Sequence, residues 1–119
     1  MRFEKTGLEN LTVELQRLDV TMNEHGLVRE GQWDYDRVTF DRKFELKDGT
    51  FYLRIQGYVT EGEVDSNHAV IKLIDPLLGK HYYPHGVEYG EGEDFPKSLV
   101  SQCEKLLASI KTEVEKYAL

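Results

Sequence analysis

Residues 37–60 read RVTFDRKFELKDGTFYLRIQGYVT, and this stretch decides the fold. Apolar and polar residues alternate on both sides of Asp48 and Gly49, which is the period of strands that bury one face. Asp-Gly is a favoured pair for the two central positions of a type I′ hairpin loop. The stretch therefore predicts an antiparallel β-hairpin joined at Asp48 and Gly49.

A two-residue loop at these positions also predicts the register of the hairpin. The predicted cross-strand pairs are Leu46 with Phe51, Phe44 with Leu53, Arg42 with Ile55, Phe40 with Gly57, and Val38 with Val59. This register places the apolar residues on one face, whereas a slip by one residue would scatter them over both. We expect the Phe40 ring to pack over the bare backbone of Gly57.

Arg42 is the exception on the apolar face. Its guanidinium could reach solvent at an edge, be turned outward by a β-bulge, or pair with a buried carboxylate beneath the helices. The edge and the bulge are the more common outcomes. The third outcome would order a polar pocket, so Arg42 is a candidate binding residue.

The opposite face of the hairpin is polar and rich in residues that make protein contacts. Its residues are Arg37, Thr39, Asp41, Lys43, Glu45, Tyr52, Arg54, Gln56, Tyr58 and Thr60. Because Tyr and Arg are enriched at protein interfaces, Tyr52, Arg54 and Tyr58 are candidates for a binding surface. The face could form a homodimer, be covered by the loop at residues 80–89, or simply be solvated.

Helical spacing appears on both sides of the hairpin. The N-terminal stripe has Asn10 as its expected cap and Gly26 as its expected stop, and its apolar residues are Leu11, Leu15, Leu18 and Met22. A second stripe follows Asp94 and Pro96 in an expected first turn. Its members are Leu99, Cys103, Leu106, Ile110, Val114 and Tyr117.

Two further strands complete the predicted sheet. Residues 68–74 carry apolar side chains at both even and odd positions, which indicates burial on both sides of the strand. Residues 27–35 are expected to form a strand or a broken strand. We therefore predict the α+β class for a single domain spanning residues 1–119. Its antiparallel sheet has three to four strands, with an N-terminal and a C-terminal helix packed on one face, in the order α-β-β-β-β-α.

Composition excludes several classes of partner. The net charge of −7 disfavours nucleic acid and anionic membranes, since both would repel the chain. Cys103 is the only cysteine, so no intramolecular disulfide or cysteine-rich zinc site can form. No apolar signal-peptide core follows the first residues and no apolar run reaches membrane-spanning length, so we expect neither a signal peptide nor a membrane span. We expect a cytoplasmic protein in a reducing compartment, without a cofactor.

Residues 80–89 read KHYYPHGVEY and are expected to be neither helix nor strand. They carry His81, Tyr82, Tyr83, His85, Glu88 and Tyr89. Pro84 disfavours a helix, so the spacing of the two histidines is not a helical zinc motif. The segment could pack on the sheet as an amphipathic lid, or bind a partner directly. As a third alternative, His81, His85 and Glu88 could converge as ligands for zinc or iron.

Three runs resemble the signature segments of the YugN-like family, small proteins of bacilli and their relatives. They are GQWDY at residues 31–35, LGKHYYPHG at residues 78–86 and VEYG at residues 87–90. The resemblance spans nearly the whole chain. It implies a cytosolic bacterial protein with one α+β domain, and it brings no activity, substrate, cofactor or catalytic residue with it.

Two classes of function follow from these observations. The first, which we favour, is a non-enzymatic binding or regulatory module that self-associates as a homodimer through the face of Tyr52, Arg54 and Tyr58. The second is a small-molecule or metal-dependent enzyme that uses His81, His85 and Glu88, with tyrosines orienting the substrate. Cys103 is not a candidate nucleophile, because a cysteine on an apolar helix stripe is inert.

Overall fold

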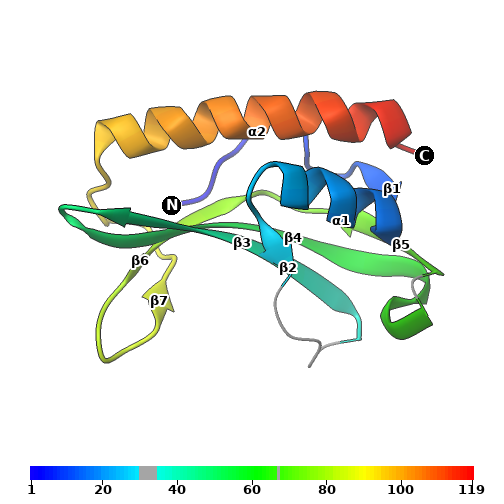
Figure 1. Cartoon of the computed structure of the whole chain (residues 1–119), viewed down its shortest axis with the longest axis horizontal. Coiled ribbons are helices and arrows are strands. Elements are labelled where there is room, and N and C mark those ends of the chain that lie inside the picture. Colours follow the sequence, from blue (N-terminus) through cyan, green and yellow to red (C-terminus); the bar gives the residue numbers. More distant parts are fainter. Residues whose placement is uncertain (30–34, 67) are drawn as a thin grey trace.

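The computed structural model describes residues 1–29, 35–66 and 68–119. Its elements, in chain order, are β1 (Thr12–Glu14), α1 (Leu15–Glu24), β2 (Val28–Arg29), β3 (Arg37–Leu46), β4 (Gly49–Glu63), the 3₁₀ turn η1 (Val64–Ser66), β5 (His68–Leu73), β6 (Leu77–His81), β7 (Val87–Glu88) and α2 (Lys97–Tyr117). Figure 1 shows one sheet with both helices on the same side. The predicted α+β class and the single helix-bearing face are therefore confirmed.

Strand β4 organises the antiparallel sheet. Strand β3 pairs along one of its edges, while β6 and β5 share the other edge, at residues 51–54 and 57–63 respectively. Strand β1 extends the sheet beyond β5, β2 extends it beyond β3, and β7 pairs with β6. Within the described residues the sheet has seven strands, more than predicted, because short segments before α1 and after β5 also pair with it.

Two sequence predictions about extended segments need correction. Residues 80–89 were expected to lack regular structure, but their two ends belong to β6 and β7. Of the strand expected at residues 27–35, only β2 is present in the described part, and residues 30–34 lie outside the described residues. The strand expected at residues 68–74 is confirmed as β5.

The predicted hairpin is confirmed, but its register differs by two residues. The observed pairs are Leu46 with Gly49, Phe44 with Phe51, Arg42 with Leu53, Phe40 with Ile55, and Val38 with Gly57. Lys47 and Asp48 form the turn, and Gly49 follows it with a φ of 140°. Glycine thus supplies the positive φ after the turn rather than inside it. A shift of two residues preserves the faces, so the apolar set still lies together.

Gly57 does not lie opposite Phe40, as predicted, but between Val38 on β3 and Leu73 on β5. A Cβ atom at residue 57 would lie 2.9 Å from the Lys72 carbonyl oxygen and closer still to the Ile71 side chain. The glycine therefore allows β4 and β5 to pack closely in the core.

Arg42 follows none of the three predicted alternatives, since its guanidinium binds a backbone carbonyl and β3 pairs with β4 without a bulge. Its side chain is half-buried, and Nη1 donates a hydrogen bond to the His25 carbonyl oxygen at 3.0 Å, just beyond the end of α1. The guanidinium also lies 4.9 Å from the centre of the Phe44 ring. Within the described residues Arg42 makes no ion pair with a carboxylate. It binds the negative end of the helix dipole instead.

Helix α1 begins later than predicted and ends where predicted. Asn10 is not its cap: Asn10 adopts a φ of 70°, and β1 intervenes before the helix starts at Leu15. Gly26 follows the helix with a φ of 80°, and the Leu27 amide donates to the Met22 carbonyl at 2.8 Å. This left-handed glycine ends the helix as expected.

Helix α2 buries a stripe that differs from the predicted one at two positions. The buried residues are Leu99, Cys103, Leu107, Ile110 and Val114. Leu106, which was predicted, is only partly buried, and Tyr117 is exposed. A stripe at helical spacing drifts around the helix over this length, so Leu107 rather than Leu106 points at the sheet.

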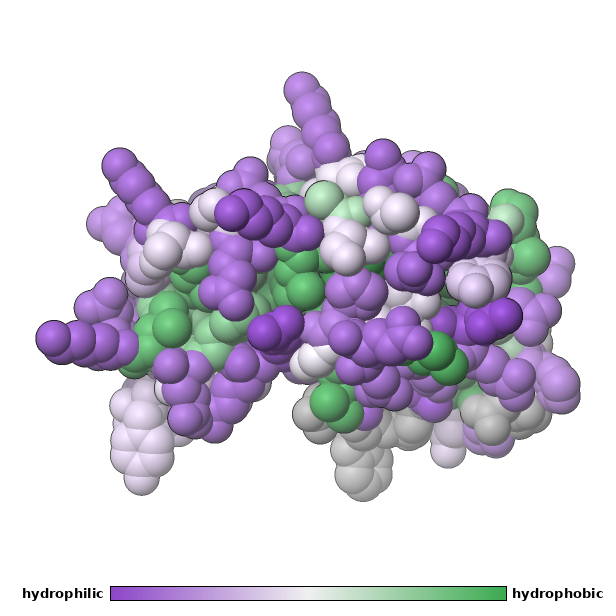
Figure 2. Space-filling model, turned by 45° about the horizontal axis from the view of Figure 1, so that its top comes forward, coloured by the Kyte–Doolittle hydropathy of each residue, from purple (hydrophilic) through white to green (hydrophobic). Residues whose placement is uncertain are grey.

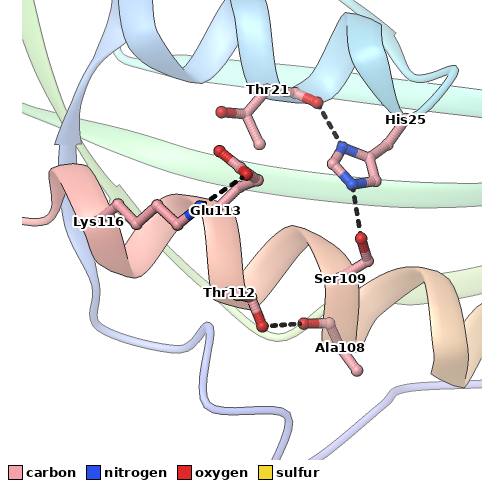
Figure 3. Close-up of polar contacts among 7 residues, drawn as sticks. All are labelled: Thr21, His25, Ala108, Ser109, Thr112, Glu113 and Lys116. Carbon is pink, nitrogen blue, oxygen red and sulfur yellow. Dashed lines mark hydrogen bonds and ion pairs between the residues drawn. The ribbon is translucent and has the colours of Figure 1, made fainter.

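His25 joins the two helices (Figure 3). Its Nδ1 atom lies 2.7 Å from the Thr21 carbonyl oxygen in α1, and Nε2 lies 2.9 Å from the Ser109 hydroxyl in α2. The end of α1 is therefore held both by this bridge and by Arg42.

The helix-bearing side is mostly hydrophilic. In Figure 2 apolar residues appear between the hydrophilic ones rather than as one continuous patch. Among the described residues, none of the helices combines the length and apolar character needed to cross a bilayer.

Candidate functional site

The helix-free face of the sheet holds a ladder of cross-strand polar pairs. Asp41 lies directly opposite Arg54, whose Nε and Nη2 donate to the two carboxylate oxygens at 2.9 Å each. The Asp41 side chain is only 9% exposed, so the salt bridge is largely shielded from water. Bidentate geometry and burial make it much stronger than an ordinary surface pair.

Two further rungs lie on the same face. Gln56 Nε2 donates to Thr39 Oγ1 at 3.0 Å, and Arg37 Nη2 donates to the Tyr58 hydroxyl at 3.0 Å. The Arg37 guanidinium also lies 4.8 Å from the centre of the Tyr58 ring. Every one of these bonds joins directly opposed residues of β3 and β4. The two strands therefore pre-order the polar face.

Tyr89 caps the Asp41–Arg54 rung from the chain segment after β7. Its ring lies across Gly79, and a Cβ atom at residue 79 would be 2.6 Å from Tyr89 Cδ1. The Arg54 guanidinium lies 4.7 Å from the centre of the Tyr89 ring. Only glycine at residue 79 leaves room for this contact.

The Tyr89 hydroxyl is held in its neutral form. The hydroxyl is buried and has no hydrogen bond partner among the described residues. Burial, together with the nearby negative charge of Asp41, raises the pKa of Tyr89 to about 12, although Arg54 opposes the shift. Desolvation penalises the phenolate most, so Tyr89 acts as a packing residue at neutral pH.

His81 and Tyr52 extend this coverage. Their rings meet edge to face with centres 6.5 Å apart, and both residues are half-buried. The segment at residues 80–89 thus covers one end of the polar face through His81 and Tyr89, which was one of the predicted alternatives. Tyr83 is 90% exposed, and His85 is exposed at the hairpin tip.

Tyr82 takes part in a different cluster. Its hydroxyl donates to a Glu93 carboxylate oxygen, which raises the pKa of Tyr82. Lys80 Nζ lies 3.7 Å from the other Glu93 oxygen and 5.3 Å from the centre of the Tyr82 ring. A pocket of about 310 Å³ lies beside this cluster, lined by Tyr82, Glu88, Gly90, Glu91, Gly92 and Glu93.

The three residues considered as metal ligands are not gathered into one site. His81 ends β6, His85 lies at the exposed tip, and Glu88 pairs opposite Lys80 in β7. Within residues 1–29, 35–66 and 68–119, no group of three or more His, Cys, Asp or Glu side chains is placed to hold a metal.

The runs that suggested a family lie largely within this hairpin: residues 78–86 and 87–90 form β6, β7 and their turn. Residues 31–34 of the remaining run lie outside the described residues. Residues 4–114 match the profile of the YugN-like family. The chain belongs to the YugN-like family.

Relatives and a solved structure agree with this membership. The chain is 56% identical to the uncharacterized protein YlbA of Bacillus subtilis (strain 168) over 110 residues, which cover 92% of each chain. It is 33% identical to the uncharacterized protein YugN of the same organism over 89 residues, which cover 74% of this chain and 66% of that one. The crystal structure of the uncharacterized conserved protein YugN from Geobacillus kaustophilus HTA426 superimposes with a TM-score of 0.86 at 61% identity, covering 98% and 96% of the two chains.

The sequence of this YugN-like chain did not lead us to Asp41, which forms the shielded salt bridge with Arg54, or to Gly79, which leaves room for the Tyr89 ring. A signal for Asp41 was present, because the predicted register would have placed Lys43 opposite Arg54. Like charges directly opposite each other are destabilising, whereas the observed register pairs Arg54 with Asp41. No comparable local signal marks Gly79, since its close contact with Tyr89 comes from the segment after β7.

Proposed function

We propose that the chain is a cytoplasmic, non-enzymatic binding module that self-associates, with the helix-free sheet face as its recognition surface for a protein partner. The observation that carries this proposal is the ladder of Arg37–Tyr58, Thr39–Gln56 and Asp41–Arg54. Its side chains are already ordered by cross-strand bonds, so they lose little conformational entropy when a partner binds.

The exposed part of the ladder has the composition of an interface. Tyr58 is 42% exposed and is stacked with Arg37, and both residue types are enriched at binding hot spots. Lys72 lies opposite Tyr58 on β5 and so extends the same face. Glu14 and Glu61 both pair with Val70 on β5, so acidic side chains lie on this face beside Lys72. The exposed face therefore presents charges of both signs, which suits a protein partner with a complementary pattern of charge.

The shape of the face favours a partner other than a second copy stacked flat upon it. Figure 1 shows the hairpin of β6 and β7 projecting from the sheet on the side away from the helices. Stacked sheets pack about 10 Å apart, so this projection would obstruct two flush faces. Self-association would then use another surface.

The ionisable groups support binding rather than catalysis. Asp41 and Arg54 neutralise each other, and Tyr89 stays protonated. Burial raises the pKa of the Cys103 thiol to about 11, so it is a poor nucleophile at neutral pH. A buried free thiol also fits a reducing cytoplasm.

The experiment that tests the recognition surface is site-specific photo-crosslinking in Bacillus subtilis cells that express this chain in place of its relative YlbA. A photoreactive amino acid replaces Tyr58 on the sheet face, and in a matched control it replaces Glu113 on α2. We expect a discrete adduct with another protein from residue 58 that weakens when Arg37 is replaced by Ala. Equal adducts from both positions, or none from residue 58, would contradict the proposal.

A further inference from the structure

The outer edge of β3 is open near the hairpin turn. Strand β2 pairs only with Phe40 and Asp41, and the segment just before it contacts the Arg42 side chain through His25 and Gly26. No strand among the described residues pairs with residues 43–46 on that edge. Unpaired strand edges are templates for pairing with another chain.

The alternation of backbone hydrogen bonds shows which residues face the open edge. The Val59 amide donates to the Asp36 carbonyl at 3.0 Å, so even-numbered residues of this strand bond toward β4. The backbone amide and carbonyl groups of odd-numbered residues point away from β4, toward the edge on which Asp41 pairs with Val28 of β2. Lys43 and Glu45 therefore direct their amide and carbonyl groups to the open edge.

The side chains of these two residues have opposite charge. Lys43 Nζ lies 2.9 Å from Glu45 Oε1, with the two side chains 51% and 71% exposed. Between them Phe44 points to the helix side with 7% exposure, followed by Leu46 at 39%. Such inserted charges oppose pairing with an ordinary apolar strand. They do not oppose pairing with a strand of complementary charge.

We infer that the edge of β3 pairs with the same edge of a second copy of this chain, antiparallel and centred on Phe44. The twofold axis then places Lys43 of each copy opposite Glu45 of the other. A twofold centred on Lys43 or on Glu45 would set like charges against each other, and one centred between residues would mismatch the backbone groups. The charge pattern thus selects one register.

The proposed contact between the two β3 edges combines backbone hydrogen bonds with side-chain ion pairs. Each Lys43–Glu45 pair is a hydrogen-bonded pair in which both residues exchange amide–carbonyl bonds. The sheet continues across the two copies, so both helix layers lie on one side and both helix-free faces on the other. The inference rests on the proposed self-association but not on recognition of a partner by the sheet face.

The test is analytical ultracentrifugation of the full chain and its charge variants over a wide concentration range. Lys43→Glu and Glu45→Lys should each weaken self-association about tenfold or more, because each sets like charges against each other. The double variant Lys43→Glu/Glu45→Lys should restore it. An equimolar mixture of the two single variants should form a mixed dimer, since the glutamates of one then face the lysines of the other.

The outcomes separate this inference from the proposed function. Circular dichroism serves as the control and should show that each variant is folded, because residues 43 and 45 are exposed. If the wild-type chain associates but the single variants associate equally well, or their mixture forms no mixed dimer, the edge contact is wrong and self-association stands. A wild-type chain that stays monomeric at high concentration overturns both the edge contact and self-association, while the crosslinking at residue 58 still tests the recognition surface.

Discussion

Tyr89 lies across Gly79, with its Cδ1 atom 2.6 Å from the place that a Cβ atom of residue 79 would occupy. Through this contact the segment after β7 reaches over β6 and covers Arg54 on β4. The coverage of the sheet face therefore depends on the absence of one side chain.

Gly79→Ala should lower the free energy of unfolding by about 1–3 kcal/mol, because the new methyl group must displace the Tyr89 ring. Urea denaturation followed by circular dichroism measures the change. The matched control is Gly86→Ala in the same hairpin, where nothing lies within 4 Å of the new atom. This control should change stability by no more than about 0.5 kcal/mol. Equal effects of the two substitutions would contradict the packing argument.

Tyr89 should make the chain less stable at alkaline pH. Its pKa is about 12 in the folded chain against 10.0 for an ordinary tyrosine, so between these values the unfolded chain releases the proton first. Stability is then lost as the pH rises from about 10 to about 12. Tyr89→Phe should reduce the slope of stability against pH in this range, because phenylalanine has no proton to release. An unchanged slope would show that Tyr89 titrates normally.

The Asp41–Arg54 pair should contribute strongly to stability. Asp41→Ala should cost about 2–4 kcal/mol, since it removes two charge-assisted hydrogen bonds and leaves a guanidinium partly buried. A double-mutant cycle with Arg54→Ala measures the coupling energy of the pair. For comparison, Lys116→Ala breaks the exposed pair with Glu113 and should cost less than about 1 kcal/mol. A coupling energy as small as that of the exposed pair would argue against an anchoring role.

Ser109→Ala should weaken the connection between the helices by about 0.5–1.5 kcal/mol, because the His25 Nε2 atom loses its partner in α2. Ser101→Ala is the control, since Ser101 is an exposed residue of the same helix and gains the same helix propensity. Thermal unfolding of both variants separates the two contributions. If Ser109→Ala stabilises the chain as much as Ser101→Ala, the bridge shown in Figure 3 contributes nothing.

Cys103 should react slowly with thiol reagents while the chain is folded. Its side chain is fully buried, and burial raises the pKa of the thiol to about 11, so little thiolate is present at neutral pH. Labelling with iodoacetamide should accelerate strongly in denaturing urea. Fast labelling of the native chain would show that α2 opens readily from the sheet.

Local patterns in the sequence determined the two helices and the strands β3, β4 and β5, although not the short strands β1, β6 and β7. Alternation around Asp48 and Gly49 predicted the hairpin, and Gly26 marked the end of α1, because both signals act within a few residues. The polar face and its candidate residues Tyr52, Arg54 and Tyr58 also followed from the two-residue period of the strands.

Only the tertiary structure decided the register and the covering of that face. Two registers that differ by two residues bury the same apolar set, so the apolar pattern alone could not choose between them. The charges opposite Arg54 favour the observed register, but the pairing of Asp41 with Arg54 was missed. The position of Tyr89 over Gly79 and the bond from Arg42 to His25 join segments distant in the chain. Such contacts depend on how whole elements pack, and no local period of side chains encodes them.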